Sequence, residues 1–71
     1  MQQLINEAAA IIRQYNVALA DAFLAQPFRR VELACAFSRG FVQNPEDDAP
    51  EFCNLVLRVA YADKEARRLA A

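Results

Sequence analysis

Apolar side chains fill eight of the eleven positions in the segment EFCNLVLRVAY, from Glu51 to Tyr61. On a helix, at about 100° per residue, they spread over roughly 240° of the circumference and leave only Asn54 and Arg58 on the remaining side. This apolar surface is wider than a single stripe that faces the core of the same chain. We therefore expect part of this helix to be covered by another polypeptide.

The chain has 71 residues, which is near the lower limit for a single hydrophobic core without metals, disulfides or association. It contains 15 alanines but only one glycine, one serine and no threonine, so it favours helices and is poor in strand and turn residues. We expect a single all-α domain over residues 1–71. Its predicted architecture is two long antiparallel helices with a short middle helix, assembled as a dimeric bundle.

The first helix is predicted over residues 2–25, where Pro27 disfavours its continuation. Apolar residues at spacings of three and four form its core face, which comprises Leu4, Ala8, Ile11, Tyr15, Ala18 and Ala22, widened by Ile5, Ile12, Leu19 and Phe23. A thinner stripe of Ala10, Val17 and Leu24 lies among polar positions. This second stripe is either ordinary surface exposure or a contact with another chain.

The middle helix is predicted over residues 28–41, and Arg30 is its misfit, because on the helical wheel it projects between Phe37 and Phe41. One interpretation is an arginine whose stem lies on apolar surface while its charged end reaches water. The other is a recognition patch, since arginine and aromatic residues are enriched among interface hot spots. On the second interpretation Arg30, Phe37 and Phe41 contact a partner protein.

The connection GFVQNPEDDAPE holds the only glycine, two prolines and four carboxylates, so it is predicted to be a loop. Asp48 and Glu51 have the spacing of a helix N-cap and its reciprocal partner, which predicts a last helix over residues 49–70. We assign its line of Phe52, Leu55, Val56, Val59, Ala62, Ala66 and Leu69 to the core. The surplus side of this helix, with Val17 and Leu24 of the first helix, then supplies the predicted dimer interface of Val17, Leu24, Cys53, Leu57 and Tyr61.

The composition argues against an enzyme or a metalloprotein. Histidine is absent and Ser38 is the only serine or threonine hydroxyl, so the usual acid–base or nucleophilic arrangements cannot form. Cys35 and Cys53 are too few for a structural zinc site and are predicted to be buried thiols, with a disulfide left open for an oxidising compartment. We expect no cofactor.

The net charge of −1 shows no basic excess, and the apolar runs are shorter than the ~20 residues of a membrane span. We expect a cytoplasmic protein that binds neither membrane nor nucleic acid. The alternative is a helix-turn-helix-like DNA-binding regulator that uses Arg29, Arg30 and Arg39. The acidic connection argues against that alternative, because it would repel phosphate.

The remaining function is protein–protein interaction. We expect a homodimer that binds an unidentified partner protein and modulates it, as an inhibitor would, by covering a surface rather than by chemistry. In general character the chain resembles small helical inhibitors, anti-activators and adaptors.

Overall fold

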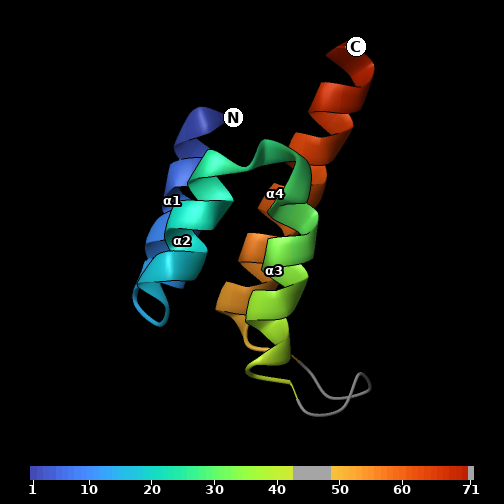
Figure 1. Ribbon diagram of the computed structural model, residues 1–71. Helices are drawn as coiled ribbons and strands as arrows, with labels where there is room; N and C mark the ends of the chain where they lie inside the picture. Colours follow the sequence, from blue (N-terminus) through green and yellow to red (C-terminus); the bar gives the residue numbers. More distant parts are fainter. Residues whose placement is uncertain (43–48, 71) are drawn as a thin grey trace.

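Helices account for most of the residues that the computed structural model describes, which are residues 1–42 and 49–70. Over these ranges the chain is all-α and contains no strand, as predicted from its composition. The elements are α1 (Gln2–Arg13), α2 (Val17–Ala25), the short 3-10 helix η1 (Pro27–Arg29), α3 (Arg30–Arg39) and α4 (Glu51–Ala70) (Figure 1).

The predicted first helix is in fact two helices, so the three-helix architecture is wrong in this respect. Asn16 adopts an extended conformation (φ −155°, ψ 102°), and its side-chain oxygen accepts a hydrogen bond from the backbone N–H of Leu19 at 3.0 Å. The N–H groups of Tyr15 and Asn16 both bond to the carbonyl of Ile12, which ends α1. Asparagine is a preferred N-cap residue. Its cap lets α2 fold back beside α1 as a hairpin (Figure 1).

Two helices of the same chain cover the wide apolar surface of α4. Helix α4 packs against both α1 and α3, and α2 packs against α1 and α3. The α1–α2 hairpin therefore lies alongside the α3–α4 pair, and the core fills the space between them (Figure 1). The four helices form one compact unit in which two neighbours, rather than one, cover α4.

Each of the four α-helices contributes to the hydrophobic core, whose buried members are Ile5, Ala8, Ala9, Ile12, Ala20, Phe23, Leu33, Ala34, Phe37, Cys53, Val56, Val59 and Ala60. The predicted core line of α4 is partly wrong. Val56 and Val59 are buried as expected, but Ala62, Ala66 and Leu69 are exposed. In their place α4 buries Ala60 and also Cys53, which was predicted to lie in the dimer interface, because these two residues face α1 and α3.

The other helix boundaries follow the sequence more closely. Helix α2 ends at Ala25, ahead of Pro27, and the middle segment folds as η1 followed by α3. Helix α4 begins at Glu51, two residues later than predicted. The proposed N-cap Asp48 lies outside the described residues. Glu51 forms an ion pair with Arg58 (Oε1 to Nη2, 2.8 Å), so it interacts with the polar side of its own helix.

Candidate interaction surfaces

Arg30, predicted to contact a partner, lies in the interior and is only 6% exposed. Its Nε donates to the carbonyl of Phe23 (2.8 Å), its Nη2 donates to the carbonyl of Leu24 (3.0 Å), and its Nη1 donates to Oδ2 of Asp63 (3.3 Å). The two carbonyls belong to the last turn of α2, where a helix leaves such groups without internal partners. Arg30 therefore caps α2 from the first position of α3.

The burial of Arg30 corrects two interpretations of the sequence. Its charged end does not reach water along an apolar stem, and it is not presented to another molecule. The helix-turn-helix alternative loses the same residue, because a buried guanidinium cannot contact phosphate or bases. Of the other two arginines in that alternative, Arg29 pairs with Glu32 (3.1 Å), and Arg39 donates to the carbonyl of Cys35 (3.4 Å).

Asp63 is the buried partner that sequence reasoning missed. It is 4% exposed. The same Oδ2 atom that accepts from Arg30 also accepts from Nε of Arg67 at 3.1 Å and forms an ion pair with Nη2 of Arg67 at 3.0 Å. The sequence does carry a signal for it, since Asp63 follows Val56, Val59 and Ala60 at helical spacing. A carboxylate on that face and an arginine in the apolar arc of another helix are candidates for a buried ion pair.

Four aromatic rings cluster where α1 and α3 end and α4 begins. Tyr15 stacks on Phe52 (centroids 5.3 Å apart, planes 12° apart), and Phe41 meets Phe52 edge-on at 5.1 Å. Phe37, the fourth ring, is buried beneath them, whereas Phe41 is 36% exposed. Phe41 and Arg30 lie toward opposite ends of the middle segment, so the structure does not assemble the predicted patch of Arg30, Phe37 and Phe41.

The predicted dimer interface is also divided by the fold. Cys53 is fully buried inside its own chain, and this burial raises the pKa of its thiol. Leu57 is half-buried and packs against the core. Val17 and Tyr61 are exposed, at 56% and 53%. Much of the apolar surplus on α4 is therefore already covered by α1 and α3.

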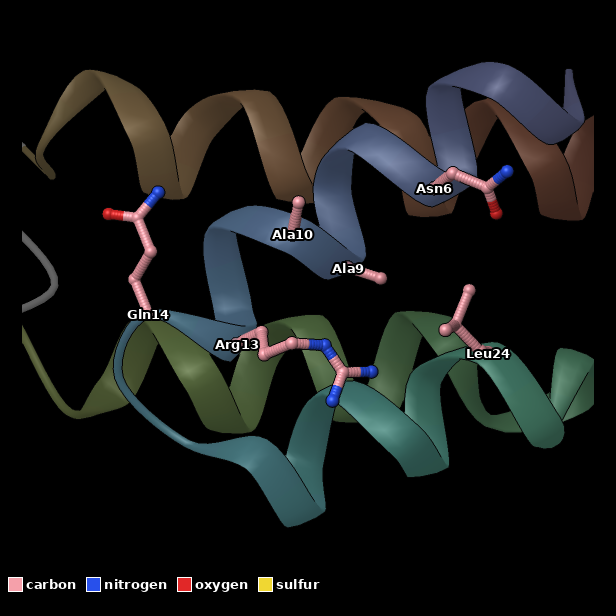
Figure 2. A pocket seen from close by; sticks show the side chains of 6 residues that line it. All are labelled: Asn6, Ala9, Ala10, Arg13, Gln14 and Leu24. Carbon is pink, nitrogen blue, oxygen red and sulfur yellow. The ribbon is translucent and has the colours of Figure 1, made fainter.

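A groove of about 360 Å³ runs along the outer face of the α1–α2 hairpin, and it is lined by Asn6, Ala9, Ala10, Arg13, Gln14 and Leu24 (Figure 2). Leu24 projects from α2 toward α1 in this view. Beside the groove, Arg13 of α1 bonds Asp21 of α2 (Nη2 to Oδ1, 2.7 Å). Ala10 and Leu24 belong to the thin second stripe of the sequence, so two of its three members line this groove.

Within the described residues no three cysteine or carboxylate side chains lie close enough together to hold a metal ion. None of the described helices has the length and hydropathy needed to cross a membrane. Comparison with known proteins found no matching family model, no matching curated protein and no matching solved structure, so the surfaces themselves carry the functional argument.

Proposed function

We propose that this chain is a small non-enzymatic binding protein that forms a homodimer and inhibits a partner protein by covering part of its surface. The observation that carries the proposal is the groove on the outer face of the α1–α2 hairpin. Its apolar wall comes from α1 and α2 and is formed by the exposed Ala10, the partly buried Leu24 and the buried Ala9. Exposed apolar surface of this kind is typical of protein contacts.

The charges beside the groove favour a second copy of the chain as the dimer partner. Arg13 and Asp21 already neutralise each other, so this face has no excess charge that would select a strongly acidic or basic molecule. Closed homodimers use the same patch on both chains, and a patch without net charge meets itself without repulsion. Asn6 and Gln14 add carboxamides that can both donate and accept hydrogen bonds across such a contact.

The dimer surface that we propose includes only some of the residues predicted from the sequence. Val17 and Leu24 stay in it, because Val17 is exposed on α2 and Leu24 lines the groove. Cys53 and Leu57 leave it, because their own chain covers them wholly or in part. Tyr61 is exposed on α4, away from the groove lining, and is available for contact with the inhibited partner.

The experiment compares two alanine-to-arginine variants by light scattering. Both Ala10 and Ala62 are exposed on helices, but only Ala10 lines the groove. The wild-type chain and Ala62→Arg are expected to have the mass of two chains, and Ala10→Arg that of one chain, because the added side chain blocks close approach. A single-chain mass for the wild type, or a two-chain mass for Ala10→Arg, would contradict the proposed dimer.

A further inference from the structure

One end of the molecule carries a positive charge that the described carboxylates around it do not balance. Asp63 is shared between two guanidinium groups, with Oδ2 at 3.3 Å from Nη1 of Arg30 and 3.0 Å from Nη2 of Arg67. The other ion pairs of the described residues match one cation with one carboxylate: Arg13–Asp21, Arg29–Glu32, Arg58–Glu51 and Arg68–Glu65. The excess charge is therefore located where η1, the start of α3 and the C-terminal half of α4 meet.

Arg67 presents this charge in a fixed orientation. Its Nε donates to Oδ2 of Asp63, its Nη2 forms an ion pair with the same oxygen, and its Cζ lies 5.1 Å from the centroid of the Phe28 ring. About a third of its side chain (30%) is exposed, and no acceptor among the described residues bonds its Nη1. A side chain that is already held in place loses less conformational entropy when it binds a ligand.

Phe28 supplies an apolar surface beside this guanidinium. The residue is 91% exposed, the largest exposure of any bulky apolar residue that the structure describes. It sits on η1 directly after Pro27, whose ring restricts the backbone at the start of this turn. Phenylalanine and arginine are both enriched in protein–protein interfaces.

We propose that the Phe28–Arg67 surface, formed by these two side chains, binds an acidic segment of the partner protein. A carboxylate of that segment accepts hydrogen bonds from the Arg67 guanidinium, and an adjacent apolar side chain covers the Phe28 ring. Hydrogen bonds between two charged groups are about twice as strong as neutral ones, so the carboxylate supplies the selectivity. This inference rests on the proposed function, and it names the chemistry of the partner.

The charge at this surface favours a peptide over a nucleic acid. Binding to a phosphate backbone gains its strength from many lysine and arginine contacts, each of which releases counterions. Here Arg30 and Arg67 share one excess positive charge and Lys64 adds a second, while Glu32 and Glu65 lie on the same helices. Two excess charges are few for a phosphate backbone, and one carboxylate beside an apolar side chain matches the charge that Arg30 and Arg67 share.

The test is a titration of the isotope-labelled full chain, followed by its backbone amide resonances. The probes are a short peptide of alternating glutamate and leucine, the matching glutamine–leucine peptide, and a single-stranded oligothymidine. We expect the glutamate peptide to shift resonances of η1 and the last turns of α4. We expect the glutamine peptide to bind about tenfold more weakly, because it loses a charged hydrogen bond.

Three variants separate the contributions to binding. Arg67→Gln is expected to weaken binding of the glutamate peptide about tenfold, while Asp63 keeps Arg30 as its partner. Phe28→Ala is expected to weaken it as well, without unfolding the chain, since the ring is exposed. Arg68→Gln is the matched control, because Arg68 bonds both carboxylate oxygens of Glu65 and should leave the affinity unchanged.

Equal binding of the glutamate and glutamine peptides, full affinity in Arg67→Gln, or stronger binding of oligothymidine would each overturn this inference. Its failure is distinguishable from failure of the proposed homodimer. A chain with a two-chain mass that ignores the acidic peptide loses only the acidic-segment surface. A single-chain protein that binds the peptide through Arg67 loses only the dimer.

Discussion

Arg30 of α3 and Asp63 of α4 form a buried ion pair between residues 33 positions apart in the sequence. Both side chains are more than nine-tenths buried, so each depends on the other for the interactions that water would otherwise supply. Because Arg30 also holds the last carbonyls of α2, the pair connects three helices at one point. It is the only ion pair between two interior residues that the described chain contains.

Replacement of Arg30 is expected to be strongly destabilising. Arg30→Ala leaves two carbonyls of α2 without their donor and removes one partner of a buried pair, for an expected loss of about 3–5 kcal/mol in the free energy of unfolding. Arg29→Ala is the matched control, because its exposed pair with Glu32 contributes about 1 kcal/mol or less. Urea denaturation followed by circular dichroism measures both. Similar losses in the two variants would contradict the interior role of Arg30.

Truncation of two phenylalanines five positions apart should have very different effects on stability. Phe23 is fully buried in the core, and Phe23→Ala is expected to cost about 3–5 kcal/mol of stability, since it leaves a cavity. Phe28→Ala is expected to change stability by about 0.5 kcal/mol or less, because the ring is almost wholly exposed. Thermal unfolding of the two variants tests this contrast. A comparable drop in midpoint temperature for both would contradict the burial of Phe23 and the exposure of Phe28.

The cap at Asn16 is expected to stabilise the α1–α2 hairpin measurably. Asn16→Ala removes the acceptor for the N–H of Leu19 and should lower the free energy of unfolding by about 1 kcal/mol. Asn16→Asp retains an acceptor at the same place and should be close to the wild type. The measurement is again urea denaturation. Equal stability of the alanine and aspartate variants would show that the cap contributes nothing.

The thiol of Cys53 is expected to make stability depend on pH in alkaline solution. Burial raises its pKa in the folded chain above that in the unfolded chain, so deprotonation favours unfolding. This contribution is present below the ordinary thiol pKa of about 8.5 and is lost as the pH rises through the higher folded-state value. Unfolding free energies measured in steps from neutral to alkaline pH will show the decline.

Two cysteine variants test whether the Cys53 thiol causes this loss of stability at alkaline pH. Cys53→Ala is expected to lose less stability than the wild type over the alkaline range, because the buried thiol is gone. Cys35→Ala, at a half-buried position, is expected to follow the wild-type curve. If Cys53→Ala and the wild type decline in parallel, other groups cause the pH dependence.

Local sequence signals predicted most helix boundaries but not the break at Asn16. Pro27 ends α2 as expected, because proline disfavours helical geometry in the residue before it. Around Asn16 the apolar periodicity continues on both sides, so the pattern predicts one long helix. The asparagine cap competes with that pattern, and the packing of α2 against α1 and α3 favours the broken form. The periodicity of apolar residues does not show which helices pack against one another.

The candidate surfaces also depend partly on local sequence and partly on packing. Arg30 stood out on the helical wheel, yet the wheel cannot show that Asp63 and two carbonyls of α2 surround it. Val17 and Tyr61 are exposed, as a contact role requires, whereas Phe37 and Cys53 are buried. Exposure depends on which helices are neighbours, and that is a relation between segments distant in the chain.

The amino-acid pattern alone predicts a helical protein whose last helix has more apolar circumference than one neighbour can cover. Only the tertiary structure shows what covers this surface: α1 and α3 of the same chain enclose Cys53, Val56 and Ala60. The physical reason is that helical spacing sets the direction in which each side chain points. What lies opposite a side chain depends on the arrangement of all the helices together.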